Sequence, residues 1–287
     1  PAAGAGDTAT PPASAAMDFL LNQASIFHRQ QAANGIALAY ARGALTLRIA
    51  RLGPDDPVVG IGHDSLGGAL GAAGQWAEAV TKMREALRIA EAEGSDYALL
   101  GTALSNLAWA LRGELDAAPD DAADREERLL QIAALERRAY KQDRHLRGAL
   151  DEWTATRLNN LCGSYHALGD RQRARRIGAL ALATRREVLA PGDPRLAFSL
   201  NNLGAIRLSD RAPVRALPLL EEALAIREAA FANNRRDPRR IKTAQWLAVC
   251  RLALPTPDAA GAAALCKQYD LDYDALALRA QEYRPLT

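Results

Sequence analysis

The residues with the clearest capacity for chemistry in this 287-residue chain are paired asparagines at a repeated spacing. Asn159 and Asn160 stand directly before Leu161, and the pair Asn201–Asn202 stands directly before Leu203. Asparagine is a mediocre helix former, so something other than helix propensity must favour it in a helical segment. Its side-chain amide offers one acceptor and two donors, which match the C=O and N–H groups of an extended peptide. We interpret the pairs either as a ladder that holds a peptide backbone or as hydrogen-bonding residues between neighbouring helices.

The other residues that commonly carry out catalysis form no recognisable site. The four histidines and three cysteines make no HExxH, HxH or CxxC motif, and no glycine-rich phosphate loop is present. We therefore predict that the protein is not an enzyme and has no cofactor and no metal. Three cysteines without close spacing also argue against a disulfide framework, and we expect Cys162 to be buried and inert.

The asparagine pairs belong to an internal repeat. Leucines at equivalent positions are separated by 41, 54, 42 and 44 residues: Leu66, Leu107, Leu161, Leu203 and Leu247. About twenty residues after most of these anchors comes a second amphipathic element, as in REALRIAEAE and EEALAIREAA. Pro and Gly in the turns between them prevent one helix from running into the next. Each repeat is therefore predicted to be a pair of helices.

Composition agrees with helices, because 62 Ala and 42 Leu make up over a third of the chain and aromatics only 5%. Helix pairs of this size must stack to bury their apolar faces. We predict an all-α fold, a right-handed αα solenoid of about five helix pairs with a C-terminal helical cap. The predicted boundaries are a flexible tether at 1–16, a solenoid at 17–254 (repeats near 17–57, 58–97, 98–148, 149–192 and 193–236, and a terminal helix at 237–254) and a cap at 255–287.

Several motifs carry a family resemblance. LNNLG at 200–204, GQWAEA at 74–79, ALAIRE at 223–228 and LGPDDP at 52–57 resemble tetratricopeptide repeats of the kinesin-light-chain type over about residues 36–254. The resemblance implies that the first helix of each pair lines a concave groove, which the residues just before and after each anchor leucine face. It implies a peptide-binding set that comprises Asp64, Ser105, Asn106, Trp109, Asn159, Asn160, Asn201, Asn202 and Gln245. We add Lys242 as the cation of the groove and His166 at its edge, with a histidine that bonds between helices as the alternative for His166.

Three features depart from the repeat pattern. Residues 112–124 and 144–153 lengthen one repeat, and we expect a tolerated surface loop, with longer helices as the alternative. Arg211 replaces the turn glycine of the last full repeat. Pro218 falls inside an expected helix, and we predict that this helix is distorted or starts late.

The formal net charge of +2 conceals an asymmetry. Residues 1–143 carry 13 Lys and Arg against 19 Asp and Glu, whereas residues 144–287 carry 23 against 15. The arginines of the second half either receive an acidic partner or lie on a solvated convex face. The opposite charges also allow a homo-oligomer in which the acidic half of one chain contacts the basic half of another.

These features lead to one main functional hypothesis. We predict a non-enzymatic module that binds an extended peptide or a segment of a partner protein in the asparagine-lined groove. One form of this hypothesis has an acidic partner. The alternatives are a regulatory or sensor domain that controls an attached or associated effector and, disfavoured because aromatics rarely interleave with the arginine clusters, nucleic-acid binding.

The sequence also bears on location. No apolar stretch is long enough to cross a bilayer, so we expect a soluble protein without a membrane partner. Free thiols favour the cytoplasm. The start at Pro1 rather than Met is interpreted as loss of an upstream segment, which leaves export after signal-peptide removal as the alternative.

Overall fold

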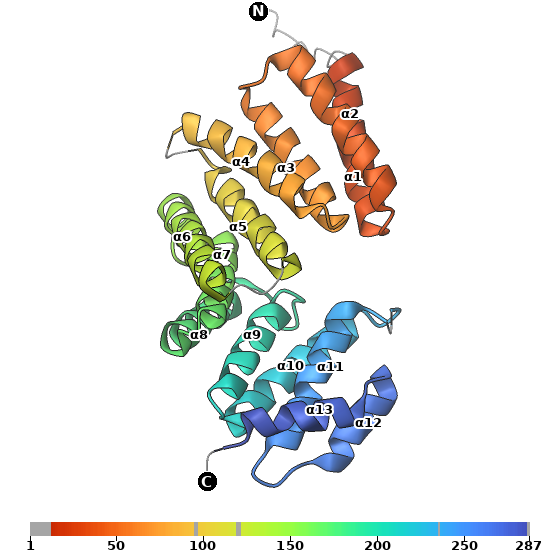
Figure 1. Cartoon of the computed structure of the whole chain (residues 1–287), viewed down its shortest axis with the longest axis vertical. Coiled ribbons are helices and arrows are strands. Elements are labelled where there is room, and N and C mark those ends of the chain that lie inside the picture. Colours follow the sequence, from red (N-terminus) through yellow and green to blue (C-terminus); the bar gives the residue numbers. More distant parts are fainter. Residues whose placement is uncertain (1–12, 95–96, 119–121, 235, 286–287) are drawn as a thin grey trace, which may run out of the picture. The chain divides into compact units, whose positions relative to one another are not determined.

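The computed structural model describes residues 13–94, 97–118, 122–234 and 236–285, and these residues form an all-α protein (Figure 1). Thirteen α-helices and a final 3-10 turn follow one another within the described residues, mostly as packed pairs, so the predicted all-α fold is confirmed. None of these helices is both long enough and apolar enough to cross a membrane. The elements are α1 (Ala13–Gln30), α2 (Asn34–Leu52), α3 (Pro57–Ala72), α4 (Trp76–Ala92), α5 (Leu100–Ala117), α6 (Ala122–Arg147), α7 (Glu152–Ala167), α8 (Arg171–Val188), α9 (Leu196–Ser209), α10 (Pro213–Ala230), α11 (Pro238–Ala253), α12 (Ala259–Tyr269), α13 (Tyr273–Ala280) and η1 (Gln281–Tyr283).

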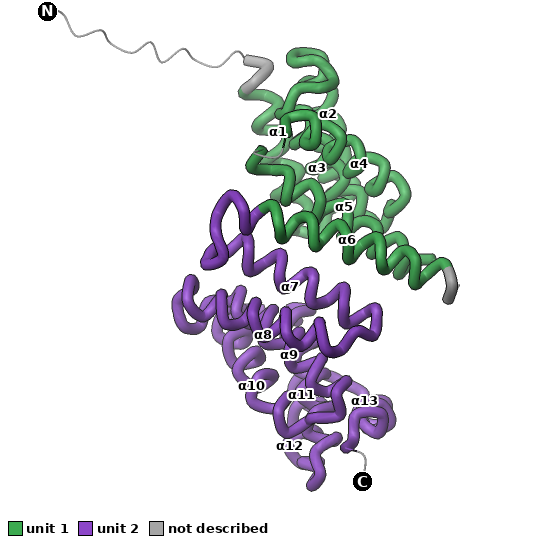
Figure 2. Tube along the Cα trace, turned by 90° about the vertical axis from the view of Figure 1, so that its left-hand side faces the viewer, with its two compact units in different colours: residues 1–142 green, residues 143–287 purple. Residues whose placement is uncertain are grey.

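The chain divides into two compact units, residues 1–142 (unit 1) and residues 143–287 (unit 2) (Figure 2). Unit 1 holds α1 to α5 and most of α6, and unit 2 holds the end of α6 and α7 to α13. In both units the first helices of successive pairs contact each other: α1 with α3 and α3 with α5 in unit 1, and α7 with α9 and α9 with α11 in unit 2. The surface that these first helices form is called the inner surface of each unit below.

Asp-Pro dipeptides set the start of two first helices. Asp56 accepts a hydrogen bond from the Val58 N–H at 2.8 Å, and Asp237 accepts one from the Arg239 N–H at 2.9 Å. In both cases the next residue is a proline in the first turn of the helix, where its missing N–H costs nothing. The two Asp-Pro dipeptides therefore begin capped helices.

Small residues allow the helices of a pair to approach closely. The residue after each anchor leucine is small in all five cases: Gly67, Ala108, Cys162, Gly204 and Ala248. A Cβ on Gly67 would lie 2.7 Å from Met83, and a Cβ on Gly204 would lie 2.7 Å from Leu220. Because real Cβ atoms do not tolerate such distances, these positions must stay small for the pairs to pack.

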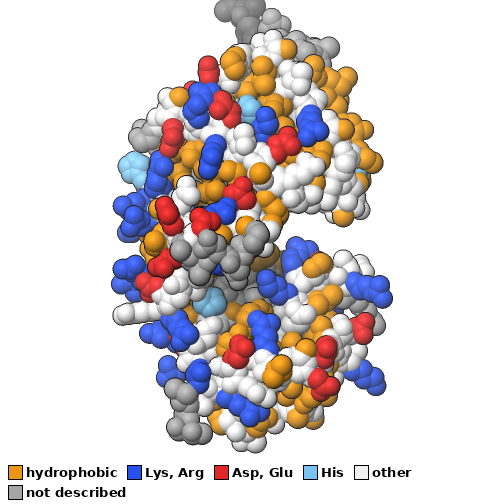
Figure 3. Space-filling model, in the orientation of Figure 1, with side chains coloured by type: hydrophobic (Ala, Val, Ile, Leu, Met, Phe, Trp, Pro, Cys, Tyr) orange, Lys and Arg blue, Asp and Glu red, His pale blue; other side chains and the backbone are white. Residues whose placement is uncertain are grey.

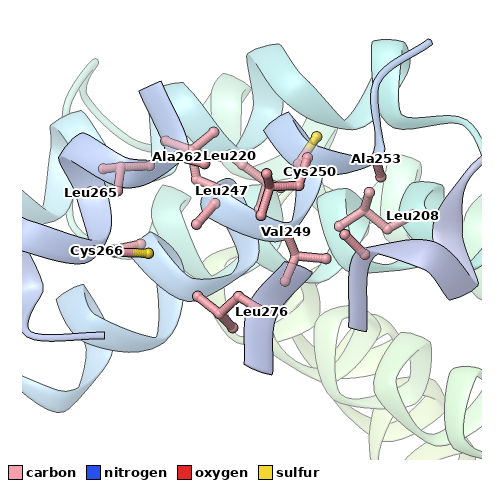
Figure 4. Close-up of a cluster of buried hydrophobic side chains, with 14 of the residues drawn as sticks. Leu208, Leu220, Leu247, Val249, Cys250, Ala253, Ala262, Leu265, Cys266 and Leu276 are labelled. Carbon is pink, nitrogen blue, oxygen red and sulfur yellow. The ribbon is translucent and has the colours of Figure 1, made fainter. Parts of the chain in front are cut away.

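The C-terminal residues complete a sixth pair and cover it. A buried cluster joins α11 to α12 and α13 through Leu247, Leu265 and Leu276, and it continues into α10 at Leu220 (Figure 4). The predicted count of about five pairs thus becomes six, because α12 packs against α11 as a second helix. At the other end, α1 begins at Ala13, inside the segment predicted as a tether, and residues 1–12 lie outside the described residues.

Two departures differ from expectation. The extra length of the third repeat is mostly helical, because α5 continues to Ala117 and α6 has 26 residues against 18 in α8. The prediction of a surface loop is therefore wrong for the described residues, and residues 119–121 lie outside them. The helix that contains Pro218 does not start late, because α10 begins at Pro213. Pro218 lies in the second turn, where the missing N–H removes one helix hydrogen bond. Arg211 does take the place of a turn glycine, with φ of 54°, where Gly74 and Gly169 have 76°.

Candidate functional site

The inner surface of unit 1 contains a cavity of about 390 Å³. It is lined by α1, α3 and α5, with one residue of α4: Ser25, Ile26, Arg29, Asp64, Ser65, Gly68, Met83, Asn106 and Trp109. Its volume lies within the range of about 300–1,000 Å³ that is typical of ligand pockets. Asp64, Asn106 and Trp109, which were predicted to face a groove, therefore meet around one hollow.

Trp109 forms an aromatic wall of this cavity. Its ring packs edge to face with Trp76 at a centroid distance of 5.1 Å, and 44% of the residue is exposed. Glycines make room for both rings, because a Cβ on Gly71 would overlap Trp109 and a Cβ on Gly113 would overlap Trp76. The wall is thus held in place by packing while one side stays accessible.

Arg29 brings a positive charge into the same cavity. Its guanidinium lies against Gly68, where a Cβ would overlap it. The side chain is half-buried and makes no hydrogen bond or ion pair with another described residue. A guanidinium without a carboxylate partner can bind an incoming carboxylate bidentately.

Asp64 and Asn106 connect α3 to α5 beside the cavity. The Asn106 side-chain Nδ2 donates to Asp64 Oδ2 at 2.6 Å, and both residues are half-buried. Ser105, the residue before Asn106, is instead buried and donates to Glu136 Oε2 at 2.9 Å. The two residues before the anchor Leu107 thus have different surroundings, one in the core and one at the cavity.

The tandem asparagines of unit 2 divide in a similar way. Asn159 is buried, and its Oδ1 accepts from the Ser199 hydroxyl and from Asn202 Nδ2, each at 3.2 Å. Arg185 donates to the same Ser199 hydroxyl at 3.0 Å and to the Arg195 carbonyl at 2.8 Å. Asn159 therefore belongs to a buried network between helices, and Asn202, the second asparagine of the next pair, takes part in it.

The same network recurs one repeat later. Asn201 is buried and accepts from the Thr243 hydroxyl at 3.1 Å, and Arg227 donates to that hydroxyl and to the Arg239 carbonyl. Burial, and then the nearby Arg239, lowers the pKa of Arg227 to about 10. Because an arginine, a hydroxyl and an asparagine recur together, the first asparagine of each pair is explained by contacts between helices.

The remaining predicted residues of unit 2 lie on its first helices, α7, α9 and α11. Asn160 and Asn202 are half-buried, and Lys242 is exposed with Gln245 half-buried beside it on α11. His166 lies 2.9 Å from the Ser209 hydroxyl through Nε2, which links α7 to α9. Burial, and then Arg171, lowers the pKa of this histidine.

The last repeat of unit 2 is covered by the C-terminal residues. Trp246, which follows Gln245, packs against Tyr283 at a centroid distance of 6.1 Å, and the Arg279 guanidinium lies 4.2 Å from its ring centroid. The inner surface is therefore less accessible at α11 than the repeat pattern predicted.

Arginines of the second half are partly structural. Arg185, Arg227 and Arg240 are buried, so they do not belong to a solvated convex face. On the face shown in Figure 3, the Lys and Arg side chains alternate with Asp and Glu and with apolar side chains. Ion pairs such as Arg186 with Glu222 use further arginines.

The cysteines in the described part of the chain are shielded from solvent. Cys162, Cys250 and Cys266 are free and buried, and burial raises the pKa of the Cys162 and Cys250 thiols to about 12. No group of three His, Cys, Asp or Glu side chains that could hold a metal ion occurs among these described residues.

Sequence reasoning missed the contribution of α1. Ser25, Ile26 and Arg29 precede the first clear repeat motif, so the anchor leucines gave no position for them. The spacing of Ser25 and Arg29 at i and i+4 on a helix was the available signal, because it places both on one face.

Comparison with known proteins identifies the repeat. Residues 138–229 match the family model of the tetratricopeptide repeat. No curated protein sequence matches the chain significantly.

Solved structures share the fold. A kinesin light chain protein of Podosopora anserina with nearly identical TPR-like repeats is 16% identical, with a TM-score of 0.59, over 74% of this chain and 96% of that one. BtubC (BKLC) from P. vanneervenii is 22% identical, with a TM-score of 0.55, over 96% of this chain and 95% of that one. The Rap conjugation gene regulator of the plasmid pLS20, in complex with the Phr* peptide, is 13% identical, with a TM-score of 0.62, over 98% of this chain and 78% of that one.

Proposed function

We propose that this chain, which carries tetratricopeptide repeats and has the fold of kinesin-light-chain-like repeat proteins, binds an extended segment of a partner protein on the inner surface of unit 1. Such folds are typically non-enzymatic scaffolds for protein interaction, and the Rap regulator with its Phr* peptide is a structural neighbour of this kind. The observation that carries the proposal is the 390 Å³ cavity that combines the Arg29 guanidinium with the exposed face of Trp109.

Each part of the cavity has a role in binding. Arg29 attracts an acidic side chain or a terminal carboxylate of the segment, because its positive charge has no carboxylate partner among the described residues. Trp109 contributes apolar contact area from a ring that Trp76 already orients, so little side-chain entropy is lost on binding. Asn106 and Ser65 present polar groups to the peptide backbone beside them.

The asparagines of unit 2 have a secondary part in this proposal. Asn160 and Asn202 are the members of each pair that are not buried, and Lys242 is exposed on the same set of helices. A partner segment that contacts unit 2 would meet these residues on its inner surface. Replacing Asn160 and Asn202 together by Ala tests this contact, because a segment that binds unit 1 alone would bind the variant unchanged.

The proposal is tested by selecting binders from random dodecapeptides displayed on phage and measuring their affinity by calorimetry. Arg29→Gln should weaken the selected peptides at least tenfold and remove the salt dependence of their binding. Arg84→Gln is the matched control, because Arg84 is an exposed arginine of α4 that lies outside the cavity.

Two results would contradict the proposal. The unaltered protein could select no peptide above the background of an unrelated helical protein. Alternatively, the selected peptides could bind Arg29→Gln and a Trp109→Ala variant as tightly as they bind the unaltered chain. Circular dichroism of each variant shows whether the fold is retained.

A further inference from the structure

A second, apolar cavity adjoins the first on unit 1. Its volume is about 150 Å³, and it lies between α3 and α5 over α4. Ile61 and Leu99 line it while remaining 38% and 36% exposed, whereas Ile89 lines it from the core with 1% exposed. An engineered apolar cavity of about 150 Å³ in another protein holds a benzene molecule. This cavity therefore has the size for one aromatic or branched aliphatic side chain.

The two cavities follow each other along the same helices. On α3 the apolar cavity extends from Pro57 to Asp64, and the first cavity extends from Asp64 to Gly68. The order on α5 is the same, with Ala103 in the apolar cavity and Asn106 in the first one. Because Asp64 lines both, a single ligand can reach both cavities without leaving the inner surface.

The helix geometry sets the distance between them. Gly60 lines the apolar cavity, and Gly68 lies under the Arg29 guanidinium. Eight helical residues separate the two glycines, which corresponds to about 12 Å at 1.5 Å per residue. An extended peptide advances about 3.3 Å per residue, so about three or four peptide residues span this distance.

We infer that the bound segment places a Leu, Ile or Phe side chain in the apolar cavity and an acidic group at Arg29, three or four residues apart. This inference rests on the proposed function and adds the side-chain pattern that the site selects. The rim of Ile61 and Leu99 is apolar and open, so filling it removes apolar surface of both partners from water. The acidic group of the segment fixes the direction in which the segment binds, because Arg29 alone carries a positive charge among the described residues that line the first cavity.

The same phage library tests the pattern with variants of the apolar cavity. Ala103→Leu fills it, since Ala103 lines the cavity with 6% exposed. Ile61→Gln changes only its exposed rim and keeps the pattern testable if the filled variant does not fold. Val58→Gln is the matched control, because Val58 lies on the same helix with the same 38% exposure but does not line the cavity.

We expect selected peptides to share a large apolar residue three or four positions from Asp, Glu or the C-terminus. Replacing that apolar residue by Ala should weaken binding at least tenfold to the unaltered chain and to Val58→Gln, but less than twofold to Ala103→Leu or Ile61→Gln. Selected peptides without this spacing, or an equal loss of affinity in all variants, would overturn the inference. The proposed function would still be supported if Arg29→Gln weakened binding. If the unaltered chain selects no peptide, both fail.

Discussion

Gly163 and Gly204 lie in the first helices of successive repeats, and the same change to Ala should have different effects on stability at the two positions. Both lie in helix interiors, so each substitution gains about 1 kcal/mol in helix propensity. Gly163 has no atom within 4 Å of an added Cβ. At Gly204 the Cβ would lie 2.7 and 2.8 Å from two carbons of Leu220, which is fully buried.

The difference between the variants isolates the packing contact, because the propensity gain is common to both. Overpacking of this kind costs about 1–3 kcal/mol. We expect Gly163→Ala to raise the free energy of unfolding by about 1 kcal/mol and Gly204→Ala to leave it unchanged or lower it by up to about 2 kcal/mol. Urea denaturation followed by far-UV circular dichroism measures both.

Equal midpoint shifts for the two variants would refute the assignment of Gly204 to close helix packing. A Gly204→Ala variant combined with Leu220→Ala is the further control. Its truncated leucine leaves space for the new Cβ, so the two substitutions should be non-additive.

Three further predictions concern stability. Asp143→Asn should lower the free energy of unfolding by about 3–5 kcal/mol, because it breaks the buried ion pair between Asp143 and Arg157 at 2.7 Å. Glu222→Gln in an exposed pair should cost less than about 1 kcal/mol, and urea denaturation compares the two variants. Arg211→Gly should raise the free energy of unfolding by up to about 1 kcal/mol, because a left-handed conformation costs a non-glycine residue about 1–2 kcal/mol. Part of this gain is lost because glycine has more conformational freedom in the unfolded chain, and thermal unfolding measures the net change. Because the pKa of His166 is lowered in the folded chain, the unfolded chain binds a proton more readily, and the free energy of unfolding should fall as the pH drops below about 6.5. His166→Gln should reduce this dependence of the free energy of unfolding on pH, which urea titrations at several pH values measure. An unchanged pH dependence would contradict the burial of the ring.

The repeat could be predicted from the sequence because its signals are local. Anchor leucines, amphipathic segments and turns with Pro and Gly are each defined by a few neighbouring residues, so their periodic recurrence predicted the helix pairs that the structure contains. The tandem asparagines were also a correct signal of unusual surroundings. Their two interpretations could not be separated, because adjacent residues on a helix point about 100° apart and only packing decides which one is buried.

The tertiary structure made that decision. Asn159 and Asn201 are buried and accept from the hydroxyls of Ser199 and Thr243, which lie 40 and 42 residues away in the chain. Arginines of other helices donate to the same two hydroxyls.

The sequence by itself determined the repeat and its helix pairs. Only the tertiary structure brought Arg29 of α1 over Gly68 of α3 and hollowed two adjoining cavities around Asp64. The physical reason is that periodicity specifies which face of each helix is apolar, whereas a cavity arises where side chains of helices far apart in the chain leave space between them.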